Sequence, residues 1–261
     1  MRIAAVVTDL DGTLLEPDGS LGPKAHAALV RLAACGVPVC PVTSKTVAEL
    51  AAFAGSVPAP APAGFENGAG IVLPDGEARL ALQAVPVAEL RVVLERLRGT
   101  TGAPVRSIEE LDDRELEALT GLTGAARARA RERRATLPLQ VDPVWDDRLR
   151  AALGEESPVR LVRGNRFLHL QGHHDKADVV PQVLALAAPD GGTIVGCGDA
   201  PNDLGLLEHC DIAVIVPGAR GPHPELTRRL PRALIAPHPH GRGWAAALEQ
   251  LLTDRNPGIR P

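Results

Sequence analysis

Several features that would define a class of protein are missing from this sequence. No apolar run approaches the roughly 20 residues that a membrane-spanning helix needs, and the first residues lead straight into a predicted strand, without the pattern of a signal peptide. The net charge of −4 provides no basic surface for nucleic acid or an anionic membrane. We therefore expect a cytoplasmic protein that binds neither nucleic acid nor a membrane.

Cysteine and lysine are both scarce. None of the four cysteines has the CxxC spacing of a metal site, and a chain of this length does not require disulfides to fold. Lysine occurs only as Lys24, Lys45 and Lys176 among 28 basic residues. Two of these lysines, Lys45 and Lys176, fall in loops that the strand pattern places at a candidate site, which favours a function for them.

The composition is that of a globular protein, with 45 % hydrophobic and 23 % charged residues. Apolar strands alternate with amphipathic helices at both ends of the chain, which predicts an α/β fold with a mainly parallel sheet flanked by helices. In the first part we expect strands at 3–7 and 37–42, helices at 23–36 and 46–54, and a hairpin of 61–65 with 71–73.

The pattern changes from about residue 84 and returns near residue 175. The intervening α+β segment comes too late to extend the first sheet simply, so we interpret it as an inserted cap. We divide the chain into a first core part, 1–82, a cap, 83–167, and a second core part, 168–261. In the cap we expect helices at 86–98, 112–121 and 123–134, strands at 104–108, 138–141, 159–162 and 166–170, and a turn at 163–165. In the second core part we expect strands at 193–196, 212–216 and 233–236, and helices at 176–188, before 209, at 225–229 and at 244–252.

Two carboxylates follow the first predicted strand, in the string Asp9-Leu10-Asp11-Gly12-Thr13. A buried parallel strand delivers such residues to the carboxyl edge of the sheet, where open α/β folds bind ligands. Side chains two residues apart on a strand point the same way. This arrangement favours phosphoryl transfer, with Asp9 as nucleophile and Asp11 as acid and base. The alternative for the same string is a solvated Asp-Gly turn.

A second acidic cluster follows the predicted strand at 193–196. It contains Asp199, Asn202 and Asp203. Mg²⁺ prefers oxygen ligands and keeps several waters, so a few carboxylates and a main-chain carbonyl suffice. We predict Asp9, the carbonyl of Asp11, and Asp199 as direct ligands, with Asp203 acting through water or as a weaker ligand. The alternative for Asp203 is an exposed acid that stabilises a helix N-terminus.

Two further loops supply groups for a phosphate. Thr43 offers a hydroxyl and the backbone near Ser44 offers amides for phosphoryl oxygens. Lys176 opens a helix, where the dipole already favours an anion. In the predicted mechanism Asp9 attacks phosphorus, Asp11 protonates the leaving alcohol, and Asp11 then activates water to hydrolyse the aspartyl-phosphate.

These four motifs, in this order, resemble those of the haloacid dehalogenase-like superfamily. The resemblance implies a Rossmann-like core, a Mg²⁺-dependent phosphatase and a large α/β cap. A narrower resemblance is to the mannosyl-3-phosphoglycerate phosphatase family, which implies hydrolysis of a phosphorylated glycosyl-glycerate to mannosylglycerate, a compatible solute. It is carried by the segments 42–46, 66–68, 119–122, 165–170 and 174–176. The family's usual Arg-Glu-aromatic-Ser-Glu-Pro segment is matched only by Arg131-Glu132, and its usual Lys-Gly by Lys176-Ala177.

A substrate of this kind carries a carboxylate beside its phosphate, and arginine suits bidentate recognition of a carboxylate. The alternative for Arg131 is a solvated arginine on an arginine-rich helix. The predicted substrate-binding residues are Ser44, Lys45, Glu66, Asn67, Arg131, Arg166 and Asn202.

Other functions remain open at this point. A different phospho-sugar phosphatase or a hexose phosphomutase of the same superfamily would carry the same core motifs. A non-catalytic sugar-phosphate sensor would keep the fold, although binding alone would not require the full set of catalytic residues. The sequence leaves the oligomeric state open, and a homodimer is compatible with it.

Overall fold

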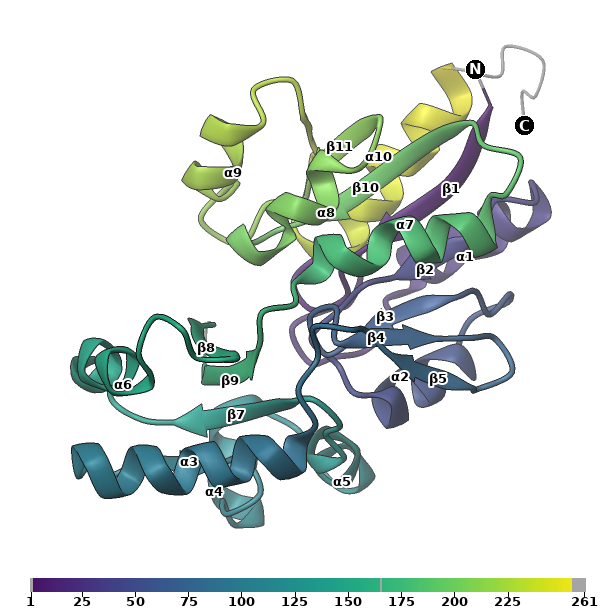
Figure 1. Cartoon of the computed structure of the whole chain (residues 1–261). Coiled ribbons are helices and arrows are strands. Elements are labelled where there is room, and N and C mark those ends of the chain that lie inside the picture. The colour runs from purple at the N-terminus through teal and green to yellow at the C-terminus, as the bar shows by residue number, and fades with distance from the viewer. Residues whose placement is uncertain (1, 165, 255–261) are drawn as a thin grey trace.

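The computed structural model describes residues 2–164 and 166–254. Asn165, which belongs to the turn predicted at 163–165 and to one segment that carries the resemblance, lies outside the described residues. Figure 1 shows a larger part, built from both ends of the chain, and a smaller part built from its middle. In the described part of the chain, no helix has the length and hydropathy to cross a membrane.

The larger part contains a five-stranded sheet in which all neighbours run parallel. Residues that alternate along the first strand face opposite layers: Val6 packs in one apolar cluster with Trp244, and Val7 in another with Val179. This confirms the predicted parallel sheet with helices on both faces. The strand order is β12 (Leu234–Ile235), β11 (Ile212–Ile215), β10 (Thr193–Gly198), β1 (Ile3–Thr8) and β2 (Val39–Pro41).

Helices cover both faces of this sheet (Figure 1). On one face lie α1 (Pro23–Ala34) and α10 (His240–Asp254); on the other lie α7 (Lys176–Ala187) and α8 (Leu204–Glu208), with α9 (Pro224–Arg229) after β11. The last helix begins four residues before the predicted start at Trp244. The second strand is only three residues long because Pro38 and Pro41 remove ladder donors, which an edge strand tolerates.

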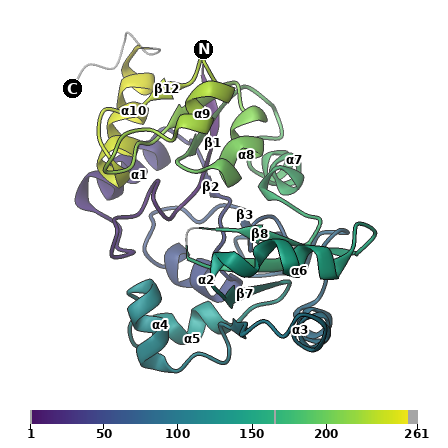
Figure 2. The ribbon, with the colours of Figure 1, turned by 90° about the vertical axis from the view of Figure 1, so that its left-hand side faces the viewer.

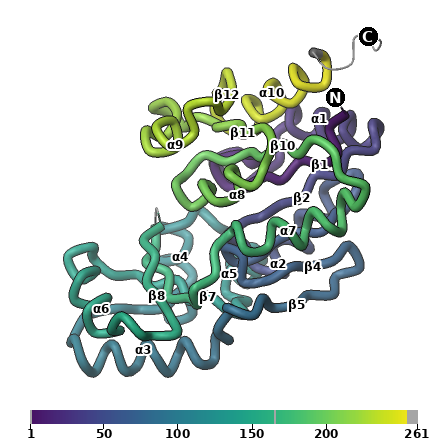
Figure 3. The backbone as a smooth tube through the Cα atoms, turned by 45° about the horizontal axis from the view of Figure 1, so that its top comes forward, coloured from purple at the N-terminus to yellow at the C-terminus, as the bar shows by residue number. Residues whose placement is uncertain are grey.

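A small antiparallel sheet extends the larger part and lies next to α7 (Figure 3). The predicted hairpin is confirmed as the pair β3 and β4, and a third strand that the sequence did not predict, β5, completes the sheet. Its bounds are β3 (Ala63–Phe65), β4 (Gly70–Val72) and β5 (Ala78–Leu80), and the preceding helix is α2 (Val47–Ala54).

The smaller part contains a four-stranded antiparallel sheet, in the order β6, β7, β9, β8. The strand β9 completes this sheet, although our division at residue 168 assigns its residues to the core; we therefore place the end of the cap after Gly172. The bounds are α3 (Val87–Thr101), β6 (Arg106–Ser107), α4 (Asp113–Thr120), α5 (Ala125–Arg131), β7 (Thr136–Gln140), α6 (Asp146–Leu153), β8 (Val159–Arg163) and β9 (Leu168–Gly172).

Two cap helices differ from the prediction. The helix α6 was not predicted; it packs on the same apolar face of the sheet as α3, through Leu149. The helix α5 ends at Arg131, not Arg134, because the backbone amides of 134–136 donate to the carboxylate of Glu66 instead of to helical carbonyls. The cap helix α5 packs against α2 of the larger part (Figure 2).

Candidate active site

The carboxyl ends of β1 and β10 bring the two acidic clusters together. These strands are parallel neighbours in the sheet, with Thr8 opposite Cys197. One carboxylate oxygen each of Asp9, Asp199 and Asp203 lie within 4.8 Å of one another. The juxtaposition depends on Gly12, which has a φ of +88° and passes so close to Asp199 that a Cβ would lie 2.4 Å from its Oδ2.

Lys176 joins this acidic group. Its Nζ donates hydrogen bonds of 2.6 Å to Oδ1 of Asp9 and 2.6 Å to Oδ1 of Asp203. Burial alone would lower the pKa of this ammonium, but the attraction of Asp203 and Asp9 outweighs burial and raises the pKa above its ordinary value. Lys176 is therefore a permanently charged cation at the first residue of α7, as its place in the sequence suggested.

The pKa values of two carboxyls reflect an excess of negative charge. Burial raises the pKa of Asp9 well above its ordinary value against the attraction of Lys176, and Asp203 and Asp199 raise it further. Burial and then the repulsion of Asp203 raise the pKa of Asp199 to about 7, although Thr13 donates a 2.9 Å hydrogen bond to it. One ammonium faces three carboxylates, so the group is short of positive charge.

The donor set suits a divalent cation. Three carboxylates with oxygen atoms this close are the ligands that Mg²⁺ prefers, and a cation would supply the missing positive charge. Asp203 is held in place by the amides of Asp199 and Ala200, each 3.0 Å from its Oδ2. It is buried, so the expected exposure of the alternative is wrong, although its carboxylate does accept amides at the start of a helical turn.

Asp11 is outside the buried group. Its carboxylate is half-exposed and forms a 2.9 Å ion pair with Lys45, whose ammonium also lies 3.7 Å from Glu49. Burial alone would lower the pKa of Lys45, but Asp11 and then Glu49 outweigh it and raise the pKa. Lys45 thus lies beside Asp11, the proposed acid and base, and in the same loop as Thr43.

The loop of residues 43–45, which we call the catalytic loop, is fixed by the turn after β3. Thr43 is buried; its amide donates to Gly64 and its carbonyl accepts from Asn67. The carbonyl of Lys45 accepts from the amide of Glu66. In the same turn Gly68, with a φ of +88°, allows the backbone to touch the start of α7, since a Cβ there would lie 1.8 Å from the carbonyl oxygen of Asp175.

The carboxylate of Glu66 is bonded to the cap and is not open to a substrate. Glu66 is fully buried, and its carboxylate accepts hydrogen bonds of 2.7–3.0 Å from the amides of Arg134, Ala135 and Thr136 and from the Thr136 hydroxyl. These contacts fasten the cap to the core. This role of Glu66 cannot be predicted from the sequence, because no local pattern connects residues 68 to 70 positions apart.

The predicted cap ligands are not gathered at the acidic group. Arg131 donates to Asp113 and to the carbonyl of Leu111, within the cap. Arg166 is exposed and donates to the carbonyl of Thr120. Asn202, the predicted ligand from the second core part, is exposed next to the buried Asp203. The cap arginine that does reach the catalytic loop is Arg133, which donates to the carbonyl of Ser44 at 2.8 Å.

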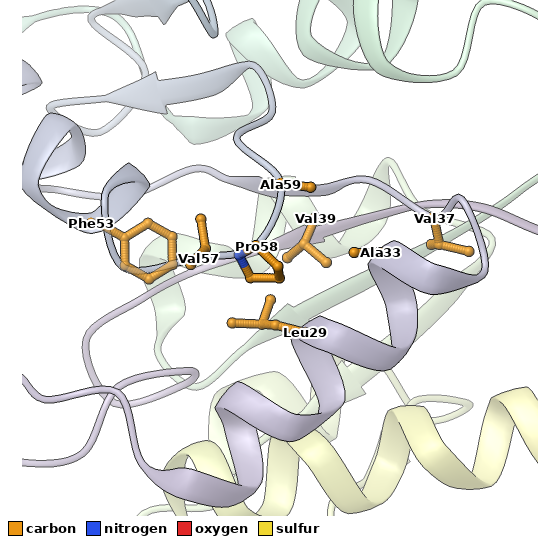
Figure 4. Close-up of a pocket in the computed structure, with 8 residues that line it drawn as sticks. All are labelled: Leu29, Ala33, Val37, Val39, Phe53, Val57, Pro58 and Ala59. Carbon is orange, nitrogen blue, oxygen red and sulfur yellow. The ribbon is translucent and has the colours of Figure 1, made fainter.

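An apolar pocket elsewhere in the core does not compete with this site. Figure 4 shows it between α1 and the chain that follows α2. Its lining carries no ionisable side chain, so it offers nothing to an anionic substrate. The lining residues are Leu29, Ala33, Val37, Val39, Phe53, Val57, Pro58 and Ala59.

Comparisons with known proteins agree with this geometry. Residues 6–96 match the family of haloacid dehalogenase-like hydrolases. A glucosyl-3-phosphoglycerate/mannosyl-3-phosphoglycerate phosphatase of Persephonella marina is 26 % identical over 95 % of this chain and 97 % of its own. The protein of that name in Methanococcoides burtonii is 26 % identical over 96 % and 98 %. A crystal structure from Thermoplasma acidophilum superposes with a TM-score of 0.74 at 16 % identity, covering 97 % of this chain and 99 % of that one.

The expected resemblance to the haloacid dehalogenase-like hydrolases is confirmed, and the family match covers the first core part and the start of the cap. The predicted class of enzyme, a phosphoric monoester hydrolase of this family, is confirmed. The narrower resemblance is confirmed as well, since two relatives named glucosyl-3-phosphoglycerate/mannosyl-3-phosphoglycerate phosphatase match nearly the whole chain.

Proposed function

We propose that this phosphatase hydrolyses a glycosyl-3-phosphoglycerate, with mannose or glucose as the sugar, to the glycosylglycerate and inorganic phosphate. The observation that carries the proposal is the buried group in which Lys176 bridges Asp9 and Asp203 beside Asp199. The substrate is proposed from the names of the two relatives that match over most of their length. A product of this kind is a compatible solute, as the narrower resemblance implies.

The acidic group would hold one divalent cation, for which we propose Mg²⁺. Asp9 and Asp199 would be direct ligands with the carbonyl of Asp11, and Asp203, already engaged by two amides and Lys176, would support them. When bound, the cation reduces the repulsion between a carboxylate and an approaching phosphate. The residues themselves carry the remaining steps.

In the first step an oxygen of Asp9 attacks phosphorus, and the bond from phosphorus to the ester oxygen breaks. Asp11, at the exposed side of the site, would give a proton to the departing alcohol. In the second step Asp11 takes a proton from water, and the water oxygen attacks phosphorus; the bond from phosphorus to the Asp9 oxygen breaks, inorganic phosphate leaves and Asp9 is restored. Lys176 and Thr43 stabilise the charge that spreads over the phosphoryl oxygens.

The experiment is a phosphate-release assay with mannosyl-3-phosphoglycerate, glucosyl-3-phosphoglycerate and a panel of hexose phosphates, in the presence of Mg²⁺. We expect the glycosyl-glycerate phosphates to give the highest kcat/KM. A preference for a hexose phosphate contradicts the proposed substrate. Isomerisation without phosphate release indicates the phosphomutase alternative, and binding without turnover indicates the sensor.

The first prediction concerns the nucleophile. The substitution Asp9→Asn removes the attacking oxygen and a charge but keeps the shape of the side chain, so turnover should fall by at least about 10³-fold while the circular dichroism spectrum stays unchanged. Asp18→Asn, on an exposed loop, is the matched control and should retain wild-type activity. Residual turnover in Asp9→Asn near the wild-type rate would refute covalent catalysis by Asp9.

A further inference from the structure

The cap touches the catalytic loop through Arg133. Its Nη1 donates to the carbonyl of Ser44 at 2.8 Å, and its Nε donates to the carbonyl of Ala130 at 2.9 Å. Nη1 also lies 3.4 Å from the hydroxyl of Thr136, at the start of β7. The guanidinium is thus fixed from the cap side against the loop that supplies Thr43, next to the proposed phosphate site.

The charge of Arg133 is not balanced by a carboxylate. Its three hydrogen-bond acceptors are uncharged, and within residues 2–164 and 166–254 it forms no ion pair. Two arginines of α5 behave differently: Arg127 pairs with Glu117, and Arg131 pairs with Asp113. Nη2 of Arg133 makes no hydrogen bond to any described residue, so its two N–H donors remain available for a ligand.

The polar face of the cap sheet lies toward the core beside this arginine. Leu137, Leu161 and Leu170 pair across the strands and pack on the helices of the cap. The alternate row therefore lies on the opposite face, which includes His169. Thr136, on that face, contacts Glu66 of the core.

Two arginines, Arg133 and Arg163, bring positive charge to this face beside His169. Burial, followed by the charges of Arg133 and Arg163, lowers the pKa of His169 to about 3, so its ring is neutral at pH 7. Arg163 is already paired with Asp146. The guanidinium of Arg133 contacts the catalytic loop and forms no ion pair with a described residue, so its charge is available to a ligand.

We propose that Arg133 binds the carboxylate of the substrate while its phosphate lies at Asp9, so that Arg133 sets the preference for a phosphate ester with a second anionic group. In a 3-phosphoglycerate ester the carboxylate is separated from the phosphate by two carbon atoms. The free Nη2 can donate a charge-assisted hydrogen bond to a carboxylate oxygen. This inference rests on the proposed function, because it deepens the identity of the substrate at the same site.

The test compares two substrates that differ only in this charge: mannosyl-3-phosphoglycerate and its carboxyl methyl ester. The readout is the ratio of their kcat/KM values. Losing a hydrogen bond to a charged group costs about 1.5–3 kcal/mol, so Arg133→Gln should lower kcat/KM for the acid by about 10- to 150-fold. For the ester it should change kcat/KM by less than about threefold. Arg133→Lys keeps the charge without the planar fork and should give an intermediate ratio.

Arg134→Gln is the matched control, since its side chain is exposed beside Arg133 and it should keep the wild-type ratio. If Arg133→Gln folds poorly, Arg133→Lys still reports the ratio, which a loss of folded enzyme does not change. An equal loss on the acid and the ester, or a wild-type ratio in both Arg133 variants, would overturn the inference. Those outcomes leave the proposed function standing, because that function fails only if the wild-type enzyme does not hydrolyse the acid.

Discussion

At Glu66 one carboxylate joins the two parts of the molecule. It accepts four hydrogen bonds from residues 134–136, and its backbone has a φ of +47°, which is rarely adopted by a residue other than glycine. Such a conformation costs on the order of 1–3 kcal/mol. It persists because its amide is bonded to the carbonyl of Lys45 while its side chain holds the cap.

The second prediction follows from these bonds. In Glu66→Gln an NH₂ group replaces one acceptor oxygen and faces backbone N–H donors, so at least one buried donor loses its partner. We expect the free energy of unfolding to fall by about 2–3 kcal/mol, measured by urea denaturation. Glu132→Gln removes an exposed carboxylate close to the same contact and should change it by less than about 0.5 kcal/mol. Equal stability of the two variants would contradict the role of Glu66.

Single residues also show where sequence reasoning stops. Asp9, Asp199, Asp203 and Lys176 converge as predicted, because each follows a parallel strand or opens a helix at one sheet edge. The sequence could not show that Arg133, and not Arg131, reaches the catalytic loop. This contact depends on where α5 ends, and that is decided by the distant Glu66.

Among the elements, the strands of the cap place alternate side chains on opposite faces of their sheet, one packed on the cap helices and the other directed toward the core. Leu137 and Leu139 of β7 are completely buried against α3 and α6, while Thr136, on the opposite face, contacts Glu66 of the core. The strand β5 and the helix α6 escaped prediction for a similar reason: β5 buries little, and α6 buries only one apolar side chain, Leu149. Weak apolar periodicity gives weak predictions.

The third prediction concerns β9 and pH. Burial, with Arg133 and Arg163, lowers the pKa of His169 to about 3, whereas an unfolded histidine titrates near 6.5. The unfolded chain therefore binds more protons between these values. The contribution of neutral His169 is complete above pH 6.5 and is lost as the pH falls toward 3, with a slope of at most about 1.4 kcal/mol per pH unit.

Urea denaturation at pH 7, 5.5 and 4.5 measures this dependence. His169→Gln should lose less stability than the wild type between pH 7 and pH 4.5, because it has no proton to accept at this position. His26→Gln, on the exposed side of α1, should follow the wild-type curve. If His169→Gln and the wild type lose stability in parallel, His169 is not protonated on unfolding as we describe.

In the whole molecule, the contacts between cap and core are concentrated at one segment. The carbonyl of Arg129 accepts from Thr46, Arg133 reaches Ser44, and the amides that follow bind Glu66. The core architecture was predictable because strand and helix periodicities repeat on both sides of the insertion. The end of the cap was not, since β9 is assigned by its pairing with β7 and β8 and not by its own sequence.

The fourth prediction concerns the charge of the assembled site. Three carboxylates and one ammonium come together only when both core parts fold, so a cation that binds them binds the native state alone. At 100 times its dissociation constant Mg²⁺ should add about 2.7 kcal/mol to the free energy of unfolding, measured at an ionic strength held constant with NaCl. Asp199→Asn removes one buried negative charge, so this variant should be more stable than the wild type without Mg²⁺ and gain less when Mg²⁺ is added. An equal gain in both proteins would place the cation elsewhere, because the wild type and the variant differ only in this ligand.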